Sequence, residues 1–185
     1  MCTYISAIIP KSADLDRLSP IAASFNKDLR TFRNSSIQKL LSSSEDLFLT
    51  TNGHCDCGSV LGSDRYRRRK VRDLDEERSK LAKKGWSKGK IEKALLQRSQ
   101  RILEKEQDQN SQVGKDLENW LGFLQAALAH RDTPYVGLLI HHYSGNIETE
   151  QVYVSDRQTI ASSDLNQGVL TGLDEDVIYK ISAHV

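Results

Sequence analysis

The sequence predicts an α+β fold: a mostly antiparallel sheet packed by one or two helices, with a basic helical hairpin inserted in mid-chain. Short runs of β-branched and aromatic residues recur near both ends of the chain and predict strands. A long segment between them lacks such runs and predicts helix, and it is followed by a regular apolar stripe that suits a helix packed on a sheet. The chain of 185 residues has the length of one domain with a sizeable insertion.

The first third of the chain predicts the strands of one half of the core. Residues 3–10 place apolar side chains on both faces, which is typical of an interior strand. Residues 14–25 have helical spacing, but Pro20 after Ser19 predicts that the helix begins only there. The remaining expected elements are short strands at 29–32 and 47–51, a helical turn at 35–42 between them, and a turn at Asn52-Gly53.

A change of composition divides the chain into a core, residues 1–63 and 111–185, and an inserted basic hairpin, residues 64–110. Residues 64–101 contain 15 of the 26 Lys and Arg and 6 of the 25 Asp and Glu, a net charge of +9. The rest of the chain then has a net charge of −8, although the total is only +1. The helical pattern breaks once, where Gly85 suits the end of one helix and Ser87 the N-cap of the next.

After the basic segment, residues 115–131 carry the cleanest helical stripe of the chain. We expect Trp120 and Leu124, in the middle of this stripe, to be buried against the sheet.

The last part of the chain predicts the remaining strands. Residues 135–143 are apolar on both faces, and Gly145-Asn146 predicts a two-residue hairpin turn to a partner strand at 147–154. Residues 177–181 predict a final strand by composition, although their spacing also fits a helix.

The turn His-Cys-Asp-Cys at residues 54–57 is a candidate metal site. Thiolates and imidazole are zinc ligands, and cysteines two apart in an extended chain point the same way. The alternatives are that these cysteines are small buried packing residues, or that one is a reactive thiol assisted by the neighbouring histidine. The expected zinc ligands are His54, Cys55 and Cys57, with a fourth ligand from Cys2, His141 or His142.

Cys2 also has an interpretation of its own. If Met1 is removed, the α-amino group of Cys2 can act as the general base for its own thiol. The Met-Cys opening resembles that of glutamine amidotransferases of the N-terminal-nucleophile class, and this resemblance covers the dipeptide alone. It implies a nucleophilic Cys2, with Asn52-Gly53 as an oxyanion donor. The sequence departs from that class because a predicted helix follows the first strand where those enzymes continue with further strands.

The expected hairpin at residues 135–154 also yields a candidate acid–base pair. A two-residue turn places His141 opposite Glu150, on the same sheet face as Tyr143 and Glu148. A histidine beside a carboxylate is suited to proton transfer, so His141 and Glu150 are candidate catalytic residues. The alternative is a polar sheet edge that emerges into solvent.

The basic segment has the electrostatic footprint of a phosphate-binding surface. Ion pairs four residues apart, such as Arg72 with Glu76, neutralise part of its charge. Like charges at the same spacing, such as Arg68 with Arg72, show that pairing does not account for all of it. The candidate contacts to nucleic acid or to an acidic protein are Arg65, Arg67, Arg68, Arg69, Lys83, Lys84, Trp86 and Lys88.

Two functions follow from these patterns. The first is a cytosolic, non-catalytic binding protein of antitoxin, immunity or regulatory type. The second is a small metal- or thiol-dependent enzyme, which requires the cysteines, His141 and Glu150 to converge in one pocket. Three cysteines make no even-numbered disulfide framework, which favours reduced thiols and the cytoplasm. A signal-peptide pattern and a membrane-length apolar run are both missing from the sequence, so no membrane contact is expected.

Overall fold

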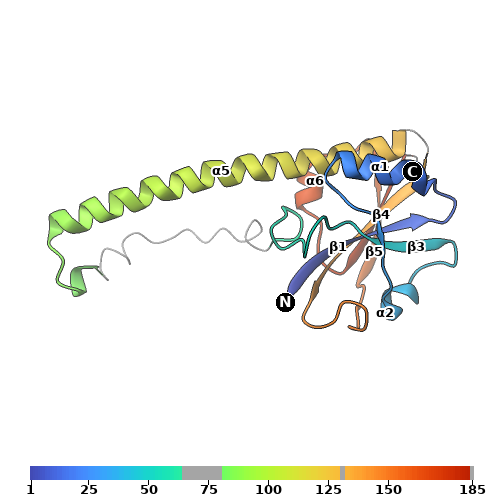
Figure 1. Ribbon diagram of the computed structural model, residues 1–185, viewed down its shortest axis with the longest axis horizontal. Helices are drawn as coiled ribbons and strands as arrows, with labels where there is room; N and C mark the ends of the chain where they lie inside the picture. The colour runs from blue at the N-terminus through green and yellow to red at the C-terminus, as the bar shows by residue number, and fades with distance from the viewer. Residues whose placement is uncertain (64–80, 130–131, 184–185) are drawn as a thin grey trace. The chain divides into compact units, whose positions relative to one another are not determined.

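The computed structural model describes residues 1–63, 81–129 and 132–183, and its core is one six-stranded sheet (Figure 1). The strands lie in the order β2-β3-β1-β4-β6-β5, and each neighbouring pair is antiparallel except β5 with β6. The predicted α+β fold with a mostly antiparallel sheet is therefore confirmed. The strands are β1 (Cys2–Pro10), β2 (Arg30–Thr31), β3 (Glu45–Leu49), β4 (Tyr135–Tyr143), β5 (Asp156–Ala161) and β6 (Val177–Ser182).

The chain divides into two units. Met1–Arg67 and Asp116–Val185 form the unit that contains the sheet, and Arg68–Lys115 form the other. The helix α5 (Lys88–Ala129) contributes residues to both. The first arm of the expected hairpin lies outside the described residues. None of the described helices is both long enough and apolar enough to span a bilayer.

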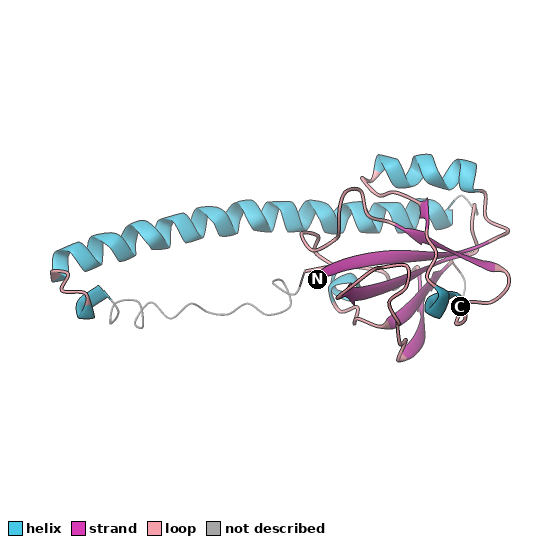
Figure 2. Cartoon of the chain, turned by 60° about the horizontal axis from the view of Figure 1, so that its bottom comes forward, coloured by secondary structure: helices cyan, strands magenta, loops and turns pink. Residues whose placement is uncertain are grey.

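One face of the sheet is covered by α1 (Leu15–Ser24) and by the C-terminal part of α5 (Figures 1 and 2). Trp120 and Leu124 of α5 are fully buried there, as the apolar stripe predicts. The two helices approach closely, because a Cβ atom at Gly122 would lie 2.3 Å from a ring carbon of Phe25. A larger residue at Gly122 would therefore push the helices apart.

Two expectations about the helices are wrong. The first is that Pro20 splits the first helix, whereas α1 runs through it. This helix begins early because the Asp14 side chain caps it, accepting a hydrogen bond from the Arg17 N–H. The second is that a separate helix begins near residue 115, whereas α5 is continuous from Lys88.

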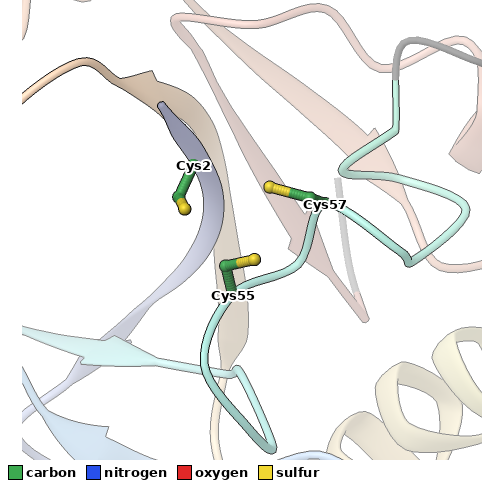
Figure 3. A group of neighbouring side chains, drawn as sticks. All are labelled: Cys2, Cys55 and Cys57. Atoms are coloured by element: carbon green, nitrogen blue, oxygen red, sulfur yellow. The ribbon is translucent and has the colours of Figure 1, made fainter.

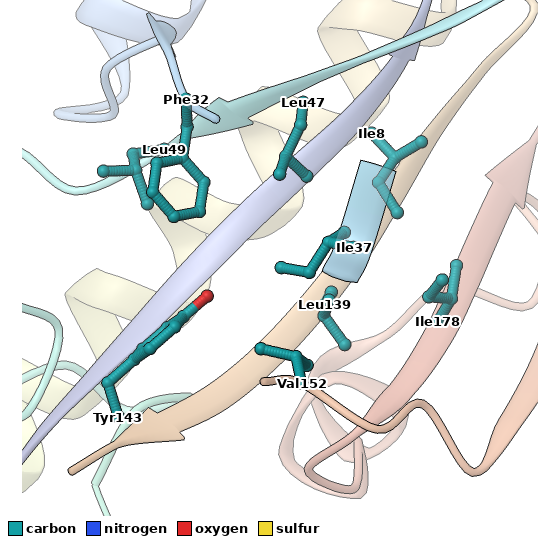
Figure 4. Close-up of a cluster of buried hydrophobic side chains, with 9 residues drawn as sticks. All are labelled: Ile8, Phe32, Ile37, Leu47, Leu49, Leu139, Tyr143, Val152 and Ile178. Carbon is teal, nitrogen blue, oxygen red and sulfur yellow. The ribbon is translucent and has the colours of Figure 1, made fainter. Parts of the chain in front are cut away.

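The opposite face of the sheet is closed by α2 (Ser35–Gln38) and by the loop after β4 (Figure 4). Ile37 from α2 and Val152 from the loop are buried with strand residues. Asn34 holds these two segments together, because its side-chain amide donates to the carbonyl groups of Ile147 and Glu150, each at 2.9 Å. The buried cluster consists of Ile8, Phe32, Ile37, Leu47, Leu49, Leu139, Tyr143, Val152 and Ile178.

The expected hairpin strand at 147–154 is also wrong. On one side β4 pairs with β1 over residues 137–143, and on the other it pairs with β6 over residues 135–139, so neither neighbour of β4 is a returning strand. Residues 147–150 form a turn instead. Two further elements are not predicted by the sequence: β5 and the short helix α6 (Gln167–Thr171), which lies in the connection between the parallel strands β5 and β6.

Candidate metal centre

The loop at residues 50–63 is fastened to β1 by hydrogen bonds of the kind that pair strands. The Thr50 N–H donates to the Ile5 carbonyl at 3.0 Å, and the Asp56 N–H donates to the Thr3 carbonyl at 2.8 Å. The Asp56 carboxylate accepts from the Ile5 N–H at 2.9 Å. The loop therefore continues the pairing of β1 beyond the end of β3.

Asp56 is the anchor of this loop. Its carboxylate also accepts a hydrogen bond from the Thr51 hydroxyl at 2.5 Å, and the residue is buried. Burial raises the pKa of Asp56 more than the hydrogen bonds from Thr51 and Ile5 and the charge of Lys27 lower it. The close packing also explains why residue 62 is a glycine, because a Cβ atom there would lie 2.2 Å from the Asp56 carbonyl oxygen.

Three cysteines converge where this loop meets β1 (Figure 3). The Sγ atoms of Cys2, Cys55 and Cys57 all lie within 4.8 Å of one another, and all three are free, partly exposed thiols. Cys2 lies at the start of β1, while Cys55 and Cys57 flank Asp56. The hydrogen bonds that hold Asp56 therefore also hold both loop sulfurs beside β1.

The surroundings shift the pKa values of the Cys57 and Cys55 thiols in opposite directions. The Thr3 N–H donates to the Cys57 sulfur at 3.1 Å. Burial raises the pKa of Cys57, but this hydrogen bond and those from the thiols of Cys55 and Cys2 outweigh it, so the pKa is lowered. For Cys55, a hydrogen bond from the backbone of Cys57 lowers the pKa. The shared hydrogen bond with the Cys57 sulfur, burial and the proximity of Cys2 act the other way and raise it to about 11.

The three sulfurs have the chemistry and the spacing of a zinc site. Zinc binds thiolate sulfur at about 2.3 Å in a tetrahedron, which places two sulfurs about 3.8 Å apart. Sulfurs within 4.8 Å of one another need to close by only about 1 Å to reach that geometry. Within the described part of the chain, this is the one group of three or more His, Cys, Asp or Glu side chains close enough to share a metal ion.

The structure places the other expected zinc ligands differently. His54 is exposed and lies outside the cysteine group, although it is the neighbour of Cys55 in sequence. His141 and His142 are not part of the group either. His142 instead has its Nδ1 atom 3.0 Å from the Thr3 hydroxyl oxygen.

A second polar group surrounds His141. Its Nδ1 atom lies 2.5 Å from a carboxylate oxygen of Asp176, and its Nε2 atom lies 3.8 Å from a carboxylate oxygen of Glu150. The ring of Tyr143 contacts the imidazole edge to face, with ring centres 4.4 Å apart. The His141 Nε2 and the Tyr143 hydroxyl are both buried without a hydrogen-bond partner in the described structure.

Glu150 lies near His141 because of a turn, and not because of the hairpin strand that the sequence predicted. The turn after β4 brings it back, and its carboxylate accepts from the N–H groups of Ser144 and Gly145. Asp176 was missed altogether. It lies 35 residues from His141, and its positive φ of 60° marks a conformation that the sequence alone does not reveal.

The two groups are neighbours on one face of the β1–β4 pair. Cys2 lies opposite Tyr143, and Tyr4 lies opposite His141. Residues directly opposite in an antiparallel pair share a face, so all four side chains are on the same side. The rings of Tyr4 and Tyr143 meet edge to face at 5.7 Å. The metal-ligand candidates and the acid–base candidates are thus joined by two aromatic rings.

The described part of the basic segment, residues 81–110, consists of helical residues 81–83, a short turn and the N-terminal part of α5. Gly85, with a φ of +76°, ends the helical residues 81–83, and α5 begins at Lys88. Trp86 is 36% exposed, and the Lys90 ammonium lies 4.3 Å from its ring centre. Lys83, Lys84 and Lys88 are exposed around it. The other expected contacts, Arg65, Arg67, Arg68 and Arg69, lie outside the described residues.

No family model, curated protein or solved structure matches this chain. We therefore infer its function from the chemistry of these groups.

Proposed function

We propose that the protein binds a zinc ion through the thiolates of Cys2, Cys55 and Cys57. The convergence of three sulfurs within 4.8 Å of one another carries this proposal. The hydrogen bond from the Thr3 N–H to the Cys57 sulfur supports it, because such bonds orient metal-bound ligands and tune the metal. Cys2 takes the place in the ligand set that the sequence analysis assigned to His54.

The donor set favours a site that holds and exchanges metal over a hydrolytic one. Three protein ligands leave a fourth position for water or for another ligand, as in zinc sites that react. Three thiolates also place one net negative charge on the centre. That charge weakens the ability of zinc to make bound water acidic. A regulatory metal-binding protein therefore fits this donor set better than a metal-dependent hydrolase does.

Metal content of protein purified without chelator or histidine tag tests the proposal. We expect about one equivalent of zinc per chain, lost in Cys55→Ser and Cys57→Ser. His54→Gln is the matched control, because His54 neighbours Cys55 but lies outside the group; it should keep its zinc. Absence of zinc from reduced protein that also fails to take up added zinc would refute the site.

A second function is binding of nucleic acid, or of an acidic protein, through the basic segment arranged as a helical hairpin. Trp86 favours nucleic acid, because it remains partly exposed among lysines and an exposed aromatic ring can stack on a base. Arg67→Ala with Arg68→Ala should weaken binding and flatten the slope of log affinity against log salt by roughly two units on duplex DNA. Absence of binding at about 50 mM salt, where counterion release favours it, would leave an acidic protein as the partner.

A further inference from the structure

We propose that the cysteine group is also a site of oxidation by hydroperoxides, which join Cys2 to Cys57 in a disulfide and release the metal. This inference rests on the proposed zinc site and adds a reaction to it. The sulfurs of Cys2 and Cys57 lie within 4.8 Å of each other and are partly exposed. A small peroxide can therefore reach them from solvent.

The contact between Cys57 and Thr3 favours a disulfide between Cys2 and Cys57. The Thr3 nitrogen, 3.1 Å from the Cys57 sulfur, is bonded directly to the carbonyl carbon of Cys2. Cys57 is therefore held against the residue that follows Cys2. Cys55 and Cys57 are a poorer pair, because a disulfide between them would close a small strained ring around Asp56, whose N–H and carboxylate are both hydrogen-bonded to β1.

The chemistry balances in two steps. The Cys57 thiolate attacks one peroxide oxygen, the O–O bond breaks, and the other oxygen leaves as water or an alcohol after taking a proton. Cys57 is then a sulfenic acid. The Cys2 sulfur attacks the sulfenic sulfur, the S–O bond breaks, and the oxygen leaves as water after taking a proton, from the Cys2 thiol in metal-free protein or from solvent where Cys2 is a zinc-bound thiolate. Two thiols lose two electrons in total, and one peroxide gains them.

Disulfide formation removes two of the three zinc ligands. Cys55 alone does not hold the ion, so zinc leaves when the disulfide forms. The disulfide then joins β1 to the loop in place of the metal. The loop itself keeps its position, because Asp56 holds it to β1 without the sulfurs. Oxidation therefore replaces the metal link between β1 and the loop with a disulfide link and leaves the sheet intact.

Hydrogen peroxide added to zinc-loaded protein tests the inference, with released zinc followed by a chromogenic chelator and the cross-link by peptide mass mapping. We expect release of the bound zinc, loss of two hydrogen atoms from the protein mass, and a Cys2–Cys57 cross-linked peptide. A thiol reductant should restore zinc uptake. A cross-link limited to Cys55 and Cys57, or sulfinic acid without any cross-link, would overturn the proposal.

Three variants identify which cysteines form the disulfide. Metal-free protein distinguishes the oxidation proposal from the zinc proposal. On metal-free protein, Cys55→Ser should still form the Cys2–Cys57 disulfide with peroxide, whereas Cys2→Ser and Cys57→Ser should not. If wild-type protein binds no zinc but forms this cross-link, the zinc proposal fails and the oxidation stands. If zinc binds stoichiometrically and peroxide produces no cross-link, the oxidation fails and the zinc site stands.

Discussion

The Nδ1 atom of His141 lies 2.5 Å from a carboxylate oxygen of Asp176, which joins the central strand β4 to the residue before β6. The backbone of Asp176 is held as firmly as its side chain. Its N–H donates to the Ile140 carbonyl at 2.9 Å, and its carbonyl accepts from the Ser155 N–H at 2.7 Å. One residue with positive φ therefore connects β4, β6 and the segment that leads into β5.

Replacement of Asp176 should separate the effect of its side chain from that of its backbone. Asp176→Ala removes the bond to His141 and leaves a Cβ atom at positive φ. We expect the free energy of unfolding to fall by about 1 kcal/mol. The loss is smaller than for a fully buried ion pair, because the Asp176 carboxylate is partly exposed. Asp176→Gly loses the same bond but adopts this φ without strain. It should be the more stable of the two in urea titration. The reverse order would show that the backbone conformation carries no strain.

The stability of the turn after β4 should depend on pH through Glu150. Hydrogen bonds from the backbone of Ser144 and Gly145, and the proximity of His141, lower the pKa of Glu150. A carboxyl group with a lowered pKa in the folded state stabilises the protein above its unfolded pKa of about 4.3, and the effect is lost as the pH falls through the folded value.

Glu150→Gln should therefore lower the melting temperature at neutral pH, and the difference from wild type should shrink below about pH 4. Glu148→Gln is the matched control, because Glu148 is an exposed glutamate of the same turn. Equal pH profiles for wild type and Glu150→Gln would contradict the assigned role.

The apolar stripe of α5 should carry much of the stability of the sheet unit. Leu124 has no exposed surface, so Leu124→Ala should cost about 2–5 kcal/mol through lost contacts and the cavity left behind. The neighbouring Gln125 is exposed, and Gln125→Ala should change the unfolding free energy by less than about 0.5 kcal/mol. Similar values for both variants in denaturant titration would show that the stripe does not pack as described.

The buried ammonium of Lys27 should make Asp116 hard to replace. Lys27 lies 2.7 Å from one oxygen of Asp116, while the other oxygen accepts from the Val60 N–H at 2.8 Å. Asp116→Ala removes the ion-pair partner of the buried lysine and leaves Asp56 as the remaining carboxyl group near it. The expected cost is therefore about 3 kcal/mol, the lower end for a broken buried pair. Lys27→Met leaves Asp116 bonded to Val60 and keeps an apolar chain over the ring of Trp120, so it should cost less. Thermal unfolding of both variants measures the difference.

Local patterns in the sequence predicted those elements whose formation depends on neighbouring residues. The strand regions of β1 and β4 and the stripe through Trp120 and Leu124 were visible, because each depends on side chains within a few residues of one another. The strand region of β6 was visible from its β-branched and aromatic composition, while its spacing also fitted a helix. The strand β5 was not visible, because four of its six residues, Asp-Arg-Gln-Thr-Ile-Ala, are polar and exposed. Its parallel pairing also depends on a connection over residues 162–176 that leaves no local turn signal.

The same limit applies to the site. The spacing of Cys55 and Cys57 is local and was visible, but their distance from Cys2 depends on Asp56 being bonded to the backbone of β1. The pairing of His141 with Glu150 was expected from a hairpin that does not exist. It arises because the turn after β4 holds the glutamate through backbone N–H groups. Contacts between distant segments follow from strand order, which hydrophobic periodicity does not specify.

The central position of β1 has a consequence for synthesis of the protein. One neighbour of β1, the strand β3, follows within 35 residues, but the other neighbour, β4, begins 125 residues after Pro10. At about 5–20 residues per second, a ribosome needs about 6–25 s to make that stretch. During this interval one edge of β1 offers unpaired backbone groups, the kind of surface on which strands of separate chains aggregate. A nascent chain of this protein should therefore bind chaperones until residue 143 has left the ribosome.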